Sequence, residues 1–328
     1  MPVLNQKPQV NLAQSTVLRM WLVFGCALGT VLYSALSDNF SSLALAIFAL
    51  AAGLSAEALA LHFGKLQTNQ NGNKTPGGSL SDGSAAASIM ILVLLLPHSV
   101  NPVYAALGAV FAMLLVKYSY GGLGANWVNP ALGAWLFIRV SWPSLFSGAP
   151  VPSGGGLDIP LRTFLNGTIF SLTGAELPPG YAELLLGQGT GGIVADRGLP
   201  VLILGTILLT AAQVNRAWIP GLYLAVYGLL VRAFGAFPGG GGLGEGDMLY
   251  CLCSGGTLAA AFLLISDPVT GAKTPVGMFC ATTLAAVLAF LFRYPGGELY
   301  GAFPAAAMTN ALVPLIRAAE RYASRDKR

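Results

Sequence analysis

The sequence contains few charged residues. Only 9% of its 328 residues are Asp, Glu, Lys or Arg, whereas 55% are hydrophobic. Soluble domains carry about 25% charged residues, so this composition excludes a soluble protein of this length. The net charge of +4 does not indicate a nucleic-acid partner either, because the basic residues stand between apolar segments and at the C-terminus. We expect a protein that lies in the lipid bilayer.

Residues that bind metals are also scarce. The two histidines, His62 and His98, are predicted to lie on opposite sides of the membrane, which argues against a bis-histidine haem site. The four cysteines form no CxxC pair and have no zinc or iron–sulfur spacing. Cys251 and Cys253 could in principle ligate a metal, but we interpret all four thiols as core residues. The first apolar run lacks a cleavage site and is expected to remain as a helix.

Long apolar segments, in contrast, are abundant. Crossing roughly 30 Å of hydrocarbon takes about 20 residues, and ten segments approach or reach that length. The third and fifth are short, so their helices are expected to be broken or tilted. We predict an all-α polytopic membrane protein with about ten transmembrane helices. In chain order the segments are 17–36, 41–61, 84–96, 103–116, 128–140, 199–213, 219–234, 249–266, 276–292 and 302–316.

The 17 basic residues indicate how the chain is oriented. With a cytoplasmic N-terminus and ten crossings, twelve of them, including Lys117, face the cytoplasm, and five, including Arg293, lie at or beyond the other face. This asymmetry satisfies the positive-inside rule. Both termini are therefore predicted to be cytoplasmic.

Two stretches of the sequence follow one plan: a start of Gly with Ser or Thr, small residues, a bulky aliphatic run and a proline. They are 82–97 and 254–275, and the run Lys117-Tyr118 with its following glycines has a weaker echo in Arg293-Tyr294. This internal repeat gives five helices to each half. An odd number inverts one half relative to the other, an architecture that forms binding sites near the midplane between broken helices. We predict a first repeat with a cytoplasmic N-terminal segment at 1–142, an extracytoplasmic loop region at 143–198, and a second repeat with a basic cytoplasmic tail at 199–328.

The repeated stretches both begin with a helix start. In the first half, Asp82 or Ser81 is the expected N-cap of a helix that follows Gly83. The equivalent start in the second half is Ser254-Gly255-Gly256-Thr257. If these starts lie within the membrane, their free N–H groups and positive dipole ends offer a site for an anion or a carbonyl group.

Polar residues inside the apolar segments are candidates for function. Glu57, in the second segment, costs about 2.5–3.5 kcal/mol at the membrane midplane, so it is expected to face a polar interior or to pair with a cation near the inner interface. Asn126 and Asn129 follow a glycine-rich turn that precedes Pro130, at the first turn of a helix. Three positions apart, the two amides are expected to point the same way, toward a ligand or into hydrogen bonds between helices.

Four motifs in order, at matching spacings, identify a relationship to a known family. They are Asp82-Gly83-Ser84-Ala85, Tyr120-Gly121-Gly122-Leu123-Gly124 with Asn129-Pro130-Ala131, Ser254-Gly255-Gly256-Thr257, and Asp267-Pro268-Val269-Thr270. Over nearly the whole chain the sequence resembles the RnfD/NqrB family of membrane subunits in ion-translocating electron-transfer complexes, and its length favours the RnfD branch. The resemblance implies a two-repeat fold similar to that of urea transporters, a place in the bacterial inner membrane, and other membrane and peripheral subunits of an Rnf-type complex as partners.

The resemblance also implies electron transfer through FMN joined by a phosphoester to a threonine. The matching stretch here is 158–164, and it places Ile159 where the acceptor threonine is expected. Isoleucine has no hydroxyl to esterify, and the nearby stretches around Ser153 and Thr173 do not restore the pattern. We predict that the usual covalent FMN is absent or displaced, and that a flavin, FMN or riboflavin, is held noncovalently if it is bound.

Three hypotheses for the function stay open. The leading one is a membrane subunit of a redox-driven Na⁺- or H⁺-translocating complex, with a flavin pocket, part of the electron and ion path, and no stand-alone enzymatic activity. The others are a small-solute transporter or channel and a flavin-free structural subunit, both with the same fold. Glu57 is the candidate ion-path carboxylate, and Asp267 either lines the cavity or forms an Asp-Pro turn. The residues expected to line the cofactor cavity are Asp82, Gly83, Ser84, Asn126, Asn129, Thr257 and Asp267.

Overall fold

All the regular elements of the described residues are helices. The computed structural model describes residues 16–36, 40–71, 82–119, 126, 128–147, 163–164, 167–168, 192–197, 203, 206–207, 216, 218–236, 241–267, 270–272 and 274–325. Within these ranges the only β-type pairing is an isolated bridge between Pro97 and Ile193. The predicted all-α fold is confirmed.

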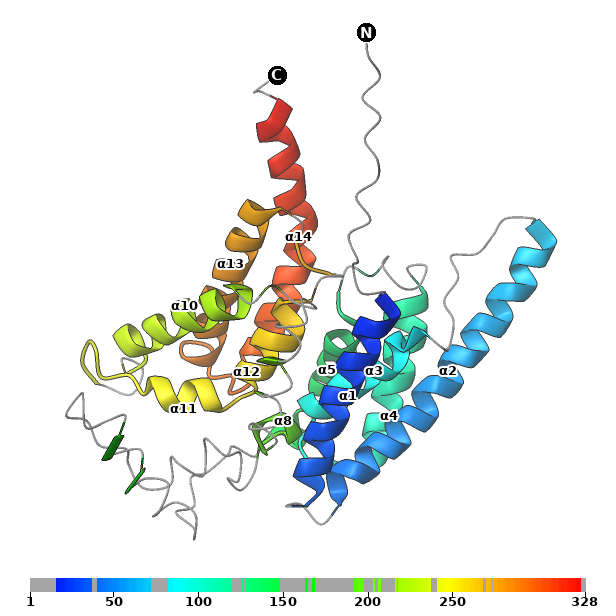
Figure 1. The fold of residues 1–328 in the computed structure, drawn as a ribbon, viewed down its shortest axis with the longest axis horizontal. Coiled ribbons are helices and arrows are strands. Elements are labelled where there is room, and N and C mark those ends of the chain that lie inside the picture. Colours follow the sequence, from blue (N-terminus) through cyan, green and yellow to red (C-terminus); the bar gives the residue numbers. More distant parts are fainter. Residues whose placement is uncertain are drawn as a thin grey trace.

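Two groups of helices lie side by side, with the short helix α8 near their junction (Figure 1). The first group contains α1 (Thr16–Ala35), α2 (Ser41–Asn71), α3 (Ser84–Leu95), α4 (Pro102–Phe111) with its π-helical continuation η2 (Ala112–Tyr118), α5 (Pro130–Ser141) and the 3₁₀ turn η3 (Pro143–Phe146). The segment α8 (Val194–Arg197) follows. The second group contains α10 (Trp218–Phe234), α11 (Met248–Cys253), α12 (Thr257–Ala259) with the π-helix η6 (Ala260–Ile265), α13 (Pro275–Arg293) and α14 (Ala302–Arg325).

Four of the described helices are long and apolar enough to cross a membrane: Val17–Ala35, Ser41–Phe63, Pro275–Arg293 and Ala302–Ala319. The helices α3 and α5 have only 12 residues each. At 1.5 Å per residue they rise about 18 Å, well short of the roughly 30 Å hydrocarbon layer, as expected for the third and fifth segments. The sixth predicted segment, 199–213, lies almost entirely outside the described residues, so ten crossings and their inverted order stay a prediction.

Glycine backbones set the starts of both repeated helices. The N-cap of α3 is Gly83 (φ 72°) and the N-cap of α12 is Gly256 (φ 70°), left-handed conformations that glycine adopts without a steric penalty. The expected N-cap at Asp82 or Ser81 is therefore wrong. Because the left-handed residue shifts the helix start by one position, Asp82 Oδ1 instead accepts the backbone N–H of Ser84 at 2.8 Å.

The predicted segment 249–266 is not one continuous helix. Residues 254–256 separate α11 from α12, with Ser254 extended and both Gly255 and Gly256 at positive φ. Membrane helices are broken in this way only where other protein groups satisfy the freed backbone. This break places polar backbone at the position that the repeat predicted as a helix start.

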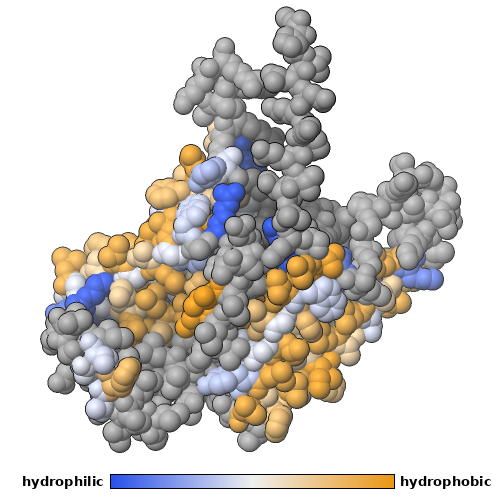
Figure 2. Space-filling view, viewed as in Figure 1, coloured by the Kyte–Doolittle hydropathy of each residue, from blue (hydrophilic) through white to orange (hydrophobic). Residues whose placement is uncertain are grey.

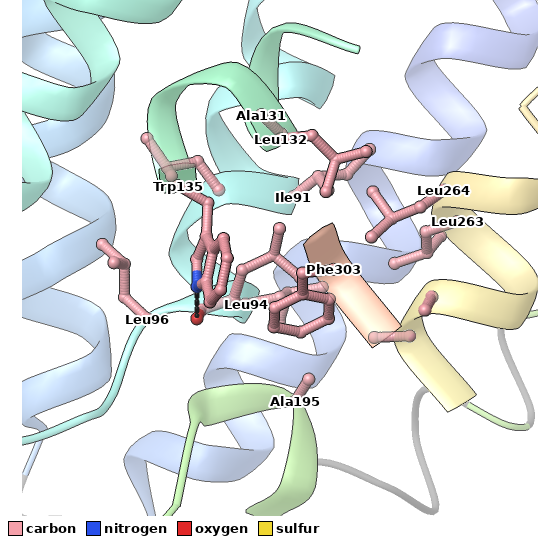
Figure 3. Close-up of a cluster of buried hydrophobic side chains, with 14 of the residues drawn as sticks. Ile91, Leu94, Leu96, Ala131, Leu132, Trp135, Ala195, Leu263, Leu264 and Phe303 are labelled. Atoms are coloured by element: carbon pink, nitrogen blue, oxygen red, sulfur yellow. Dashed lines mark hydrogen bonds between the residues drawn. The ribbon is translucent and has the colours of Figure 1, made fainter. Parts of the chain in front are cut away.

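The core lies where α3, α5, α8, η6 and α14 meet (Figure 3). The rings of Trp135 and Phe303 pack edge to face with centroids 5.0 Å apart, and Trp135 Nε1 donates to the carbonyl of Leu95 at 3.1 Å. The N–H of Val194 donates to the Leu96 carbonyl at 2.9 Å. These bonds satisfy the carbonyls at the end of α3 and attach α8 to it.

Large apolar side chains cover part of the outer surface. On α2, Ile47 and Phe48 are 57% and 53% exposed, and Figure 2 shows apolar residues gathered over the side formed by α1 and α2. Exposed apolar patches of this kind are unusual on soluble monomers. Together with the long apolar helices, they fit a multi-pass membrane protein.

Candidate functional site

A buried ion pair joins α2 to the end of η2. Lys117 Nζ lies 2.5 Å from Glu57 Oε1, and the two side chains are 2% and 1% exposed. Tyr118 donates its hydroxyl to the same carboxylate oxygen at 2.9 Å, and Lys117 also donates to Ser84 Oγ, at the start of α3, at 2.7 Å. Three helices thus meet at one charged group, which we call the Glu57 cluster: Glu57, Ser84, Lys117 and Tyr118.

The carboxylate of this cluster uses only one of its oxygens. Glu57 Oε2 is buried and has no hydrogen-bond partner among the described residues. Burying each ion costs several kcal/mol, which the pair offsets only through good geometry. Oε1 therefore holds the ammonium group, while Oε2 is placed to take up a proton or a cation. Ionisable residues inside membrane proteins commonly mark such paths.

The structure shows what surrounds Glu57 and Lys117. Glu57 pairs with a cation, as one expectation held. Lys117 is 1% exposed, and the cytoplasmic side predicted for it stays a prediction. The helix continues through η2 to Tyr118, so Lys117 lies on a helix and not in the loop that follows. The sequence offered one signal for this ion pair: a carboxylate inside the membrane needs a counter-ion.

A second cluster lies at the end of α13. Arg293 donates to Ser254 Oγ at 2.6 Å and to the carbonyls of Ser254 and Cys251 at 3.1 and 3.3 Å. Thr257 donates its hydroxyl to the same two carbonyls, at 3.0 and 2.9 Å. We call these residues the Arg293 cluster: Cys251, Ser254, Thr257 and Arg293. Among the described residues, no carboxylate forms an ion pair with Arg293.

The two clusters are arranged alike. In each half, a basic residue at the end of a helix donates to a serine beside a glycine-initiated helix start: Lys117 to Ser84, and Arg293 to Ser254. The sequence echo between Lys117-Tyr118 and Arg293-Tyr294 therefore has a structural counterpart. This correspondence supports the internal repeat.

A third set of contacts joins the two halves. Asn129 caps α5, since its Oδ1 accepts the N–H of Ala131 at 3.0 Å, and its Nδ2 donates to Asp267 Oδ2 at 3.1 Å. Thr270 donates to the same Asp267 oxygen at 3.0 Å. The side-chain cap of the next helix, α13, is Thr274, so Asp267 does not cap it. Asn126 is also buried.

The residues predicted for the cofactor cavity thus fall into separate contact sets. Asp82, Gly83 and Ser84 lie at the start of α3, beside Lys117. Thr257 belongs to the Arg293 cluster. Ser84, Asn129 and Thr257 already use their side chains in bonds within the protein. Ile159 lies outside the described residues. No group of three His, Cys, Asp or Glu in the described part could hold a metal ion.

The comparison with known families decides the relationship. A sequence model of the NQR2, RnfD, RnfE family matches residues 3–324. The chain belongs to this family. Among its relatives, the D subunit of the proton-translocating ferredoxin:NAD(+) oxidoreductase complex of Clostridium ljungdahlii is 30% identical over 251 residues, 73% of each chain. The D subunit of the ion-translocating oxidoreductase complex is 29% identical over 299 residues in Shewanella amazonensis and over 352 in Aeromonas hydrophila, covering 82% and 97% of each chain. The resemblance to the RnfD/NqrB family is confirmed.

Proposed function

We propose that this member of the NQR2, RnfD, RnfE family is a membrane subunit of a redox-driven, ion-translocating electron transport complex of Rnf type, and that it carries part of the ion path. The relatives named above are subunits of complexes that their names describe as ion- or proton-translocating oxidoreductases. The proposal assigns the chain no stand-alone activity. Its partners are the other subunits of such a complex in the bacterial inner membrane.

The Glu57–Lys117 pair is the observation that carries the proposal. A subunit that only fills space in the membrane has no need of two buried charges, because apolar residues of similar volume are often as stable or more so. Ser84 and Tyr118 orient the pair, and Glu57 Oε2, which has no hydrogen-bond partner among the residues the structure describes, can take up an ion. An arriving proton or cation neutralises the carboxylate and weakens its hold on Lys117, so ion binding would change the contact between α2, α3 and η2.

Ions leaving the Glu57 cluster would have to pass the apolar core. From Ile89 to Leu95 the buried side chains of α3 are all aliphatic or Met. A charged species cannot cross such a barrier without rearrangement, because unpaired charge in an apolar medium is costly. The core in Figure 3 therefore acts as a seal between the two ends of α3, as a coupled pump requires.

A flavin is a separate part of the proposal. When bound, it would supply one-electron chemistry. The side chains of Ser84, Asn129 and Thr257 already bond to other groups of the protein. Ile159 offers no hydroxyl for a phosphoester, so we propose that any flavin is noncovalent. Coexpression with a flavin transferase, followed by in-gel fluorescence and intact mass, tests this: a dark, unmodified band is expected, and a flavin-sized mass increase would contradict it.

Purification of the tagged chain from its native membrane tests the function. We expect other subunits to copurify and the complex, in proteoliposomes, to build an ion gradient as it transfers electrons. A chain that purifies alone and conducts small polar solutes would support a transporter instead. If the complex transfers electrons equally well but this chain moves no ion, the chain is a structural subunit.

A further inference from the structure

A buried carboxylate lies at the other end of α3, outside the candidate membrane spans. Asp196, on α8, is 6% exposed. Its Oδ1 accepts the N–H of Gly256, the N-cap of α12, at 3.0 Å. Its Oδ2 is buried and has no hydrogen-bond partner in the described part of the chain.

The position of Asp196 mirrors that of Glu57. The Glu57 cluster includes Ser84, the first residue of α3, whereas α8 is attached to Leu96, which follows the last residue of α3. The two carboxylates thus lie near opposite ends of α3, a helix of 12 residues that rises about 18 Å. Each carboxylate uses one oxygen in hydrogen bonds and leaves the other buried and unpartnered within the described structure.

The surroundings of Asp196 favour a proton over a metal cation. Arg293, whose charge acts on Asp196, repels a bound cation, and Oδ1 is already occupied by a backbone N–H. Hard metal ions need several oxygen ligands, whereas a proton needs one oxygen. Binding forms one O–H bond at Oδ2 and neutralises the carboxylate; release breaks that bond and restores the charge.

The groups that face Asp196 set this balance. Burial raises the pKa of Asp196 to about 6, although the backbone N–H of Gly256, the charge of Arg293 and the backbone N–H groups of Ile193 and Gly255 favour the ionised form. Cys253 and Tyr250 of the α11 side and Tyr300 before α14 also interact with its charge. The neighbouring α1 carries Arg19, Cys26 and Tyr33, and His98 follows the end of α3. The carboxyl group therefore changes charge within the physiological range.

We propose that Asp196 is a proton-exchange site of the ion path, at the opposite end of α3 from Glu57. This inference rests on the proposed function, because it assigns the second end of the same path and commits its ion to H⁺. Arg293 keeps the carboxyl from holding its proton too tightly, and α12 presents the N–H that fixes its orientation.

The test uses the intact complex in proteoliposomes, with Asp196→Asn compared with wild type. Asp247→Asn is the matched control, because Asp247 is exposed and caps α11 through Oδ1, a role that Asn fulfils. Electron transfer and proton movement are measured together between pH 5 and 8. We expect the number of protons moved per electron to fall at least fivefold in Asp196→Asn. The change in this ratio near pH 6 that wild type shows should also be lost. Asp247→Asn should match wild type.

An infrared titration gives a second readout that does not need transport. The wild-type complex should show a protonated-carboxyl band that disappears as the pH rises through about 6, that shifts in Asp196→Glu and that is absent from Asp196→Asn. If Asp196→Asn does not assemble, the Glu variant decides the assignment. An unchanged proton-to-electron ratio in Asp196→Asn, or no such band, would overturn the inference. If the wild-type complex transfers electrons without moving ions, the proposed function fails instead, and the infrared titration still decides whether Asp196 exchanges a proton.

Discussion

Removing the ammonium group of Lys117 should destabilise the protein far more than removing an exposed cation. Lys117→Met keeps most of the apolar stem but leaves Glu57 buried without its counter-ion and Ser84 without its donor. Breaking a buried ion pair by deleting one partner costs about 3–5 kcal/mol. We expect a loss of that size in the free energy of unfolding, measured at pH 7 by titrating the purified protein from a mild detergent into SDS.

The chain offers a matched control. Arg139 and Glu298 form an ion pair of nearly the same length, 2.6 Å, but their side chains are 26% and 25% exposed. Ion pairs that water reaches contribute about 0–1 kcal/mol, so Arg139→Met, in a partly exposed pair, should cost at most about 1 kcal/mol. The double variant Glu57→Gln/Lys117→Met should be more stable than Lys117→Met alone, because no buried charge remains unpaired. If Lys117→Met costs no more than Arg139→Met, the cluster is not the buried ion pair described here.

Three further predictions concern stability, each measured by the same unfolding titration. Gly256→Ala should cost about 2–5 kcal/mol, because the added Cβ meets the ring of Phe303 and the position requires a left-handed backbone. The control is Gly221→Ala on α10, where nothing lies within 4 Å and a gain of about 0.5–1 kcal/mol is expected. Equal changes in stability for the two variants would refute this. Asp267→Ala should cost about 1.5–3 kcal/mol, since it removes a charged acceptor that joins the two halves; an unchanged midpoint would contradict it. The contribution of Asp196 to stability should fall by about 3 kcal/mol as pH rises from 3.8 to about 6, because the fold disfavours ionised Asp196. The difference in stability between wild type and Asp196→Asn should change by that amount over this pH range; an unchanged difference would exclude Asp196 as the source.

The helices could be predicted well from the sequence because the bilayer permits few alternatives. Backbone groups in hydrocarbon must bond within a helix, so apolar length alone located α1, α2, α13 and α14. The short segments α3 and α5 were recognised for the same reason. The helix starts at Gly83 and Gly256 were more ambiguous, since the sequence does not specify which residue adopts positive φ. The N-cap of α3 was misplaced by one residue at Asp82 or two at Ser81.

The charged sites were harder to predict, because their partners are distant along the chain. Lys117 and Glu57 are 60 residues apart, as are Asp196 and Gly256. The positive-inside rule assigns basic residues to loops and cannot recognise one that pairs inside the protein. Asp196 lies in a polar interval with no helical pattern strong enough to place it. Only the repeated motifs pointed to the helix starts near which the two carboxylates lie: the start of α3 for Glu57 and the start of α12 for Asp196.

The ion-to-electron ratio of the complex carrying Glu57→Gln tests the central claim most directly. The complex would be reconstituted in proteoliposomes, with Glu298→Gln as the control for a lost carboxylate in an exposed pair. The account predicts that Glu57→Gln retains at least about half of the wild-type electron transfer while ion movement falls about tenfold or more, and that Glu298→Gln retains both. A Glu57→Gln complex that moves as many ions per electron as wild type would contradict it.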